Sequence, residues 1–443
     1  QAERQPCCHV YIGAAVAILL AMQMLKELSA CGLNIVSRPC YVMLRPAVST
    51  SVAAGRGMHV ATPALKLESP TNFGTAGKKE DGPGEFSHAD VVALLKIGTV
   101  VYVAERAARA RAENSAKGQW ARDACEALRF IEEGGYTVAG NWVDLRVSVC
   151  RSVAGSIFYA EKQWRPTKLE KPSFLQEQRI EVHNGTTLAA LQMLACSGEH
   201  ANKSPGALNF ASARNPGGGF TTGAAAQEET LARSSALYPC LTKYFDDFFV
   251  PSRQAESGTY THGVIYSPDV PVFRDDSGNI LESAYVSSFV TAAAPNVGSM
   301  RRTCGDAEAE AAAVLQERIW RVLDVFARHG VVDLVLGAWG CGVFGNNPKV
   351  VASLFARELR GRFHGHFRHV IFAVLDTSMA QVFAEEFGTD VVPPASEFSK
   401  WGAQRKWGSG NFNNRGKDVA QAKSNTNDAK GGRRKHKEGA EQN

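Results

Sequence analysis

Residues 331–348 read VVDLVLGAWGCGVFGNNP, and this stretch decides the fold. Its first six residues are an apolar run, which is typical of a strand buried on both faces of a parallel sheet. Four glycines follow, and Pro348 then stands near the first turn of a predicted helix over 348–360. Because ligands bind α/β sheets at the carboxyl ends of strands, this strand, loop and helix predict a site.

The same alternation of short apolar runs and helical spacing extends outward along the chain. The predicted strands are 179–182, 207–210, 264–267, 284–291 and 370–375. The predicted helices are 89–111, 119–132, 187–195, 227–241, 307–328 and 378–387. The expected fold class is therefore α/β, with a mixed, mostly parallel sheet between helices.

Charge is distributed unevenly along the 443 residues. The formal net charge is +5, but residues 402–443 carry ten Lys and Arg against four Asp and Glu. The rest of the chain is therefore close to neutral. A strongly basic body that coats nucleic acid is excluded, and no stable nucleic-acid complex is expected. The basic segment 402–443 is too polar to form a core and is predicted to be a disordered tail.

The first 80 residues are predicted to be a leader outside the fold. The apolar segment 10–25 is shorter than the ~20 residues that span a bilayer, so no membrane association is expected. Residues 34–66 contain arginines and no acidic residue, as an organelle transit peptide does, although a disordered leader is an equal alternative.

The cysteine pattern favours reduced thiols. Ten cysteines are spread along the chain, and none form a C-x-x-C pair. We expect an intracellular protein, with nucleus, cytoplasm and mitochondrion left open.

A second glycine-rich loop follows the predicted strand 207–210. Asn215 and Pro216 lead into Gly217, Gly218 and Gly219, and Gln227-Glu228-Glu229 stands seven residues later at the start of a predicted helix. Successive glycines let backbone amides approach an anion. The helix dipole alone would explain two acids in a first turn, but the glycine loop directly upstream favours a functional role.

The later loop contains Gly340, Gly342 and Gly345 in the spacing G-x-G-x-x-G. Between a strand and a helix, this spacing predicts a cradle for a diphosphate. A Rossmann interpretation is weaker, because the acid after the next strand, Asp376, lies about thirty residues on instead of ~20.

Taken together, the two loops resemble the poly(ADP-ribose) glycohydrolases. Their signature is three glycines, seven residues and Gln-Glu-Glu, and the words NFASARNPGGG, IYSPDVPVFRD and LVLGAWGCGVFGN are similar to the bacterial-type (microbial) branch. The resemblance covers about 117–387. It implies a macrodomain-like catalytic core over 179–392, preceded by an N-terminal accessory helical region over 81–178.

The resemblance also implies an activity and a set of site residues. The activity is hydrolysis of ribose–ribose O-glycosidic bonds in poly(ADP-ribose), releasing ADP-ribose, with ADP-ribosylated proteins as further substrates and with no metal or other cofactor. Glu229 would be the general acid, Glu228 would hold the ribose hydroxyls with support from Gln227, and Asn215 is a candidate ribose contact. The remaining implied substrate contacts are Gly217, Gly218, Gly219, Gly340, Cys341, Gly342, Val343, Phe344 and Gly345.

Glycoside cleavage requires a carboxylic acid that is still protonated near neutral pH. We expect Glu228 and a bound diphosphate to raise the pKa of Glu229 by like charge, against the opposing effect of the helix N-terminus. A macrodomain usually contacts adenine through an Asp, where this sequence offers Asn184, so the adenine contact is open. Cleavage from chain ends is expected from the resemblance.

Two other functions are alternatives to this one. A macrodomain that reads ADP-ribose without cleaving it would not need the Glu228–Glu229 pair. A Rossmann-type oxidoreductase would need an acidic ribose clamp. A metal site at His364, His366 and His369 and a nucleophilic Cys341 are both disfavoured, because neither has partners at suitable spacing.

Overall fold

A computed structural model describes residues 86–96, 101–165, 178–196, 204–255 and 257–393. The predicted leader over 1–80 and the predicted tail over 402–443 lie outside these residues. No helix among the described residues is long and apolar enough to cross a membrane.

Within the described part of the chain, eight strands form one sheet in the order β10-β4-β9-β8-β5-β7-β6-β3. Neighbours from β10 to β7 pair in parallel, whereas β6 pairs antiparallel with both β7 and β3. The expected mixed, mostly parallel sheet is thus confirmed. The strands are β3 Ile157–Tyr159, β4 Arg179–His183, β5 Gly206–Phe210, β6 Val264–Arg274, β7 Ile280–Ala292, β8 Asp333–Leu336, β9 His369–Ala373 and β10 Val391–Val392.

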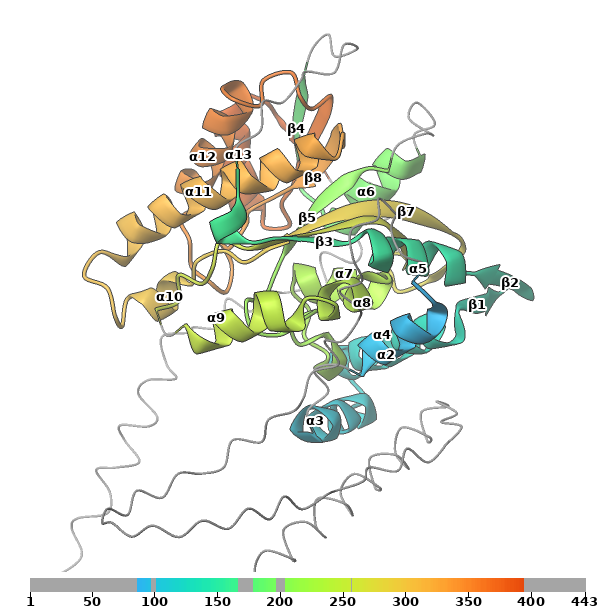
Figure 1. Ribbon diagram of the computed structural model, residues 1–443. Helices are drawn as coiled ribbons and strands as arrows, with labels where there is room; N and C mark the ends of the chain where they lie inside the picture. The colour runs from blue at the N-terminus through green and yellow to red at the C-terminus, as the bar shows by residue number, and fades with distance from the viewer. Residues whose placement is uncertain (1–85, 97–100, 166–177, 197–203, 256, 394–443) are drawn as a thin grey trace, which may run out of the picture. The chain divides into compact units, whose positions relative to one another are not determined.

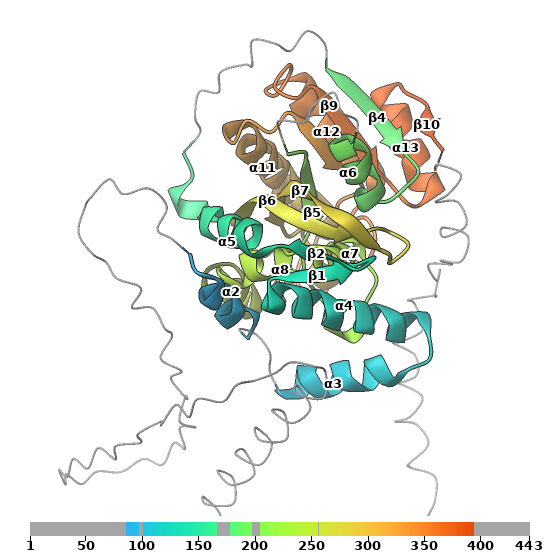
Figure 2. The ribbon, with the colours of Figure 1, turned by 90° about the vertical axis from the view of Figure 1, so that its right-hand side faces the viewer.

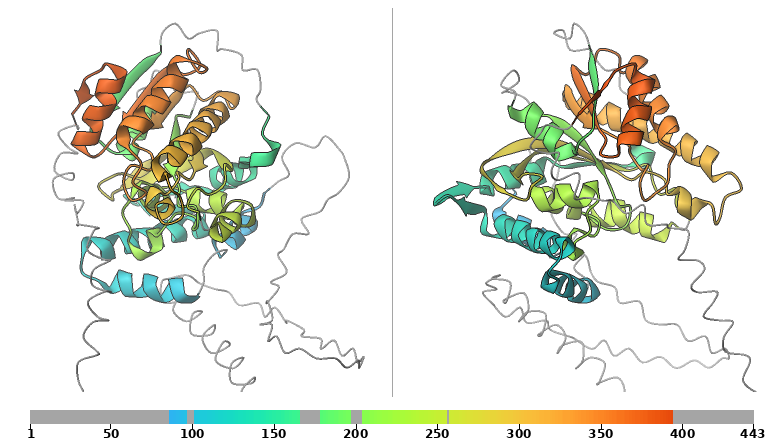
Figure 3. Two further views of the ribbon diagram at one scale, coloured as in Figure 1. Left: turned by 90° about the vertical axis from the view of Figure 1, so that its left-hand side faces the viewer. Right: turned by 180° about the vertical axis from the view of Figure 1, so that it is seen from behind.

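Helices cover both faces of the sheet (Figures 1 and 2). One face packs against α11 (Ala307–Arg328), α12 (Pro348–Arg360) and α13 (Thr377–Phe387) in one apolar core. The other face packs against α5 (Arg146–Gly155), α6 (Thr187–Cys196), α7 (Gln227–Ser234) and α8 (Leu237–Thr242) in a second core. Figure 3 shows the same layers from the other sides.

The N-terminal helices form a further layer outside α7. Helix α4 (Ala116–Glu133) begins at the capping side chain of Ser115 and ends at Gly134, whose φ of +80° suits glycine. It packs against α7 and against the short 3₁₀ turn η2 (Phe220–Thr222). The remaining elements are α2 His88–Leu95, α3 Val101–Ala112, β1 Gly135–Val138, β2 Asn141–Asp144, η1 Glu161–Gln163, η3 Phe245–Phe249, α9 Val250–Gln254 and α10 Val297–Met300.

Two predicted helices are each two helices in the structure. The helix predicted over 89–111 is α2 followed by α3, and Gly98 in the sequence between them is a poor helix former. The helix predicted over 227–241 breaks between α7 and α8, because Ser235 is extended and forms a bridge with Val272 of β6.

The two predicted loops meet at one edge of the sheet. Strands β5 and β8 are parallel neighbours, so their carboxyl ends, at Phe210 and Leu336, lie at the same edge. Strand β7 is the other parallel neighbour of β5 and ends there too, at Ala292. The segments that follow these three strands therefore lie close together.

Candidate active site

Gln227 fixes the start of α7 to the end of β5. Its Oε1 accepts a hydrogen bond from the Phe210 N–H at 2.9 Å, and its Nε2 donates to the Leu208 carbonyl at 2.7 Å. The Gln227 amide therefore holds the backbone at the end of β5 and fixes the positions of Glu228 and Glu229.

Glu228 is buried beside this anchor. Its Oε2 accepts from the Ser212 N–H at 2.6 Å, and its Oε1 has no hydrogen-bond partner among the described residues. Burial first, and the charge of Glu229 second, raise the pKa of Glu228 well above its usual 4.5. The backbone N–H of Ser212 opposes that rise. The surroundings of Glu228 thus favour its protonated form over the carboxylate.

Glu229 reaches back into the glycine loop. Its Oε1 accepts from the Gly219 N–H at 2.9 Å, and the residue retains 9 % of its exposure. Its Oε2 accepts no hydrogen bond from any described residue. Both glutamates are buried, and Glu228, at 3 % exposure, is the more enclosed of the two.

Gly218 is required by both carboxylates. Its φ is +60°, and a Cβ there would clash with Glu229 Oε1 and lie 2.9 Å from Glu229 Cδ and 3.0 Å from Glu228 Oε2. Gly217 has φ +67°, and its Cβ would press on Phe220. The glycines thus allow the loop to fold directly over the glutamate pair.

The second loop is held in shape by Asn346. Its Nδ2 donates to the carbonyls of Pro295, at 2.8 Å, and Gly340, at 3.0 Å. Gly340 has φ +73°, and a Cβ there would lie 2.5 Å from Ala294 Cβ, so the loop packs tightly on the segment after β7. Trp339 is fully buried beneath it.

The tip of this loop presents unused backbone donors. The N–H groups of Gly342, Val343 and Phe344 donate to no described residue, and Val343 is 77 % exposed. Gly345 closes the turn with φ +72° and its N–H bonded to the Gly342 carbonyl at 3.1 Å. Consecutive free N–H groups form an anion-binding concavity. The ring of Phe344 lies 6.2 Å from that of Tyr260.

Other residues named from the sequence have different surroundings. Asn215 is exposed, and its Oδ1 accepts from Arg253 at 3.0 Å. Asn184 uses its Nδ2 on the carbonyls of Val374 and Leu375, both at 3.0 Å, so this group joins the ends of β4 and β9. Burial raises the pKa of Cys341 to about 12, which keeps it a thiol at neutral pH.

Histidines near β9 serve other contacts. His369 bonds to Glu181 at 2.9 Å, and His366 is buried. Among the described residues, no group of three or more His, Cys, Asp or Glu side chains is placed to hold a metal ion.

Sequence reasoning missed three residues around the site. Asn209 is buried in β5 next to Glu228 and donates to Thr291 at 3.2 Å. Ser212 supplies the N–H that holds Glu228. Arg318 of α11 is buried and donates to the carbonyls of Ala293 and Tyr260. A polar Asn inside an apolar strand and an Arg on the apolar side of a helix were signals that could have revealed two of them.

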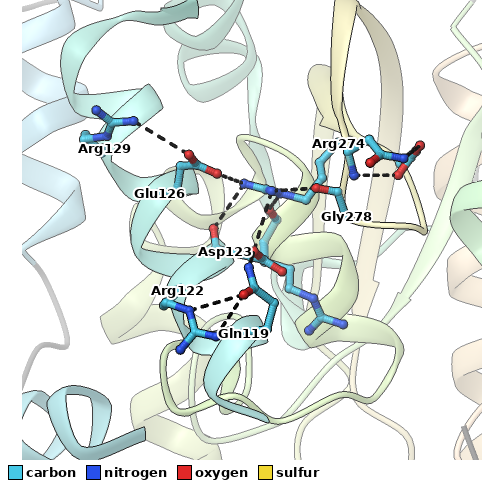
Figure 4. A network of polar contacts seen from close by, with 10 residues as sticks. Gln119, Arg122, Asp123, Glu126, Arg129, Arg274 and Gly278 are labelled. Carbon is cyan, nitrogen blue, oxygen red and sulfur yellow. Dashed lines mark hydrogen bonds and ion pairs between the residues drawn. The ribbon is translucent and has the colours of Figure 1, made fainter. Parts of the chain in front are cut away.

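Helix α4 covers the turn that follows the glycines. A Cβ at Gly223 would clash with the Lys117 carbonyl, so the chain after η2 runs directly beneath α4. Farther along α4, Glu126 accepts from the buried Arg274 at 2.8 Å, and Arg274 also donates to the Gly278 carbonyl at 3.0 Å (Figure 4). These contacts fix α4 to the β6–β7 hairpin.

A macrodomain-like sheet that carries a glutamate pair beneath one glycine loop and free backbone donors on another defines a glycosidase-type site. The family model described as "Microbial-type PARG, catalytic domain" matches residues 124–275. The structure of poly(ADP-ribose) glycohydrolase from Thermomonospora curvata is similar at 41% identity and a TM-score of 0.56, over 61% of this chain and 100% of that chain.

Two further solved structures are similar. One is the same Thermomonospora enzyme bound to the inhibitor ADP-HPD, at 42% identity and a TM-score of 0.54, over 61% of this chain and 100% of the other. Another is poly(ADP-ribose) glycohydrolase from Deinococcus radiodurans in complex with ADP-ribose, at 36% identity and a TM-score of 0.49, over 57% and 98%. A search of curated proteins gave no match. The chain belongs to the microbial-type poly(ADP-ribose) glycohydrolase family, as its two loops predicted.

Proposed function

We propose that this chain hydrolyses the ribose–ribose O-glycosidic bond of poly(ADP-ribose) and releases ADP-ribose, with Glu229 as the general acid. Family membership supports the reaction. The observation that supports the acid is the Gly219 N–H bond to Glu229 Oε1, which fixes the carboxyl, while Oε2 accepts no hydrogen bond from the described residues.

In the first step the bond between the anomeric carbon and the 2′ oxygen of the neighbouring unit breaks. Glu229 gives its proton to that oxygen, and the departing electron pair stays there, so the rest of the polymer leaves as an alcohol. Glu228 is held by the hydrogen bond that its Oε2 accepts from the Ser212 N–H at 2.6 Å. It binds the ribose hydroxyls and orients the sugar relative to Glu229.

In the second step water adds to the oxocarbenium-like carbon. The proton of that water goes either to the Glu229 carboxylate, which restores the acid, or to the diphosphate of the substrate. A second catalytic carboxylate is not required for either route, and neither is a metal or another cofactor.

The loop Gly340–Gly345 supports the diphosphate in this proposal. The free N–H groups of Gly342, Val343 and Phe344 can donate hydrogen bonds to phosphate oxygens. The absence of side chains at Gly217, Gly218 and Gly219 lets the ribose approach the first glycine loop closely. Phe344 packs on the ribose. The side chain of Asn215 adds a hydroxyl contact through its Nδ2, because its Oδ1 accepts from Arg253.

ADP-ribosylated proteins are further proposed substrates, and cleavage proceeds from chain ends.

The location and the domain organisation remain predictions from the sequence. These predictions are an intracellular protein with a leader, an accessory region over 81–178, a core over 179–392 and a tail. Strand β3 of the accessory region pairs with β6, so that region adds a strand to the central sheet.

The reaction is tested by incubating the purified chain with poly(ADP-ribose) and measuring free ADP-ribose. Release establishes the reaction. If ADP-ribose binds tightly in calorimetry without any release from the polymer, the chain is a reader and not a hydrolase. If ADP-ribose does not bind, the proposed function itself is wrong.

A further inference from the structure

A basic pocket lies on the outer side of α4, apart from the glycine loops. It has a volume of about 290 Å³ and is lined by Arg111, Arg122, Cys125, Glu126 and Arg129. Arg111 comes from α3 and the other four residues come from α4, so two helices of the N-terminal layer form it together. Nothing in the proposed reaction uses it.

The positive charge of this pocket is only weakly compensated. The one carboxylate of the lining, that of Glu126, already accepts a hydrogen bond from the buried Arg274 at 2.8 Å (Figure 4). Arg122 donates to neutral acceptors, the Gln119 Oε1 at 2.9 Å and the Arg111 carbonyl at 2.9 Å.

The other two arginines are less engaged than Arg122. The Arg111 guanidinium has no ion pair or hydrogen bond with any described residue. Arg129 has long ion pairs, at 3.8 Å to Glu126 and 3.9 Å to Glu133. The pocket therefore offers guanidinium groups to an anion, which is the chemistry that recognises phosphates.

The pocket is formed by the two helices that pack next to the Glu229 side of the site. In the proposed reaction Glu229 protonates the leaving oxygen, so the remaining polymer lies on the Glu229 side of the scissile bond. Glu229 is bonded to Gly219, and the chain continues from there into η2. Both α3 and α4 pack against η2, so these two helices border that side of the site.

We propose that the Arg111–Arg122–Arg129 pocket binds a diphosphate of poly(ADP-ribose) upstream of the unit being cleaved. This inference rests on the proposed function and adds a second contact for long polymers. It makes affinity depend on chain length, because a polymer that reaches both sites gains a second binding event on the same molecule.

The test compares binding of long poly(ADP-ribose) and of free ADP-ribose to Arg111→Gln/Arg129→Gln. The measurement is made in the Glu229→Gln background, so that the polymer is not cleaved. Arg122 is left intact because its bond to the Arg111 carbonyl joins α3 to α4. We expect the Kd for long polymer to rise about tenfold and its salt dependence to weaken, while the Kd for ADP-ribose stays within about twofold.

The matched control is Arg357→Gln/Arg360→Gln, which removes two exposed arginines from α12 on the opposite face of the sheet. It should leave both affinities unchanged. An unchanged polymer Kd in the pocket variant, or an equal loss in the control, would overturn the proposal. So would full displacement of the polymer by single-stranded RNA of the same charge, which would indicate a general polyanion surface. Failure of the wild type to release ADP-ribose is a separate outcome, and it counts against the proposed reaction alone.

Discussion

Gly218 lies between the two carboxylates on which the proposed chemistry depends. Its backbone is at φ +60°, and both Glu228 and Glu229 occupy the space that a side chain would need. A single methyl group at this position therefore tests whether the arrangement of the glutamates, and not only their presence, supports turnover.

Gly218→Ala should lower kcat/KM by about 100-fold, because displacing a catalytic group by about 1 Å has effects of that size. The left-handed backbone should also lower the free energy of unfolding by about 1–2 kcal/mol. Steady-state kinetics and denaturant unfolding measure both. Gly305→Ala is the control, since nothing lies within 4 Å of a Cβ there, and it should leave both unchanged. Normal turnover in the Gly218 variant would contradict the geometry of the site.

Glu228 should make the stability of the protein depend on pH. Its folded-state pKa is raised, so the folded protein holds a proton that the unfolded chain releases near pH 4.5. The free energy of unfolding of the wild type should therefore fall as the pH rises above 4.5 through the folded-state pKa.

Glu228→Gln removes this titration and should lose activity. The free energy of unfolding of the variant, relative to that of the wild type, should increase from pH 5 to pH 8. Thermal unfolding at the two pH values gives the comparison, with the exposed Glu282→Gln as control. A difference in Tm between wild type and Glu228→Gln that is the same at pH 5 and at pH 8 would mean that the folded-state pKa of Glu228 is not raised.

At the scale of elements, Arg318 connects helix α11 to the segments next to the second glycine loop. It donates to the Ala293 carbonyl at 2.7 Å, to the Tyr260 carbonyl at 3.0 Å and to the Thr259 carbonyl. Tyr260 has φ +58°, an unfavourable backbone for a residue with a side chain, and its ring faces Phe344. We therefore expect Arg318 to position Phe344 and the glycine loop through Tyr260.

Arg318→Lys should weaken ADP-ribose binding about tenfold and lower the free energy of unfolding by about 2–4 kcal/mol, because buried carbonyls lose charged donors. Calorimetry with ADP-ribose separates this from a purely structural role. Arg321→Lys, one turn away and paired with Glu317 at 2.8 Å, should lose stability without losing affinity. Unchanged affinity in Arg318→Lys would remove the positioning role.

Sequence patterns were most informative where local signals and tertiary structure agree. Helices α11 and α12 begin and end at the predicted residues, because Asp306 and Asn347 cap them and each has one clear apolar face. The edge strands β3 and β10 were not predicted, because segments of three and two residues are too short to show a period.

The break between α7 and α8 was also not predictable, since it depends on Val272, a residue distant in sequence. The candidate site shows the same division. Its glycines and glutamates were predicted from spacing, whereas Ser212 enters it through a backbone contact that only the folded chain creates.

At the scale of the whole molecule, every group assigned to the proposed reaction lies between Asn209 and Asn346. The basic segment 402–443 contributes none of them. Deleting Gly402 to Asn443 should therefore leave kcat/KM on short polymers nearly unchanged, as ADP-ribose release would measure. A large loss of activity on short polymers would make the segment part of the site.

The proposed reaction depends most directly on Glu229, so the decisive measurement is ADP-ribose release from poly(ADP-ribose) by wild type and Glu229→Gln, with ADP-ribose binding to both in parallel. The amide keeps the size of the side chain and the acceptor for the Gly219 N–H but cannot donate a proton as an acid. Release by wild type, a loss of at least about 100-fold in the variant and near-equal binding are the predicted results. Turnover retained in Glu229→Gln would contradict the assignment of the acid.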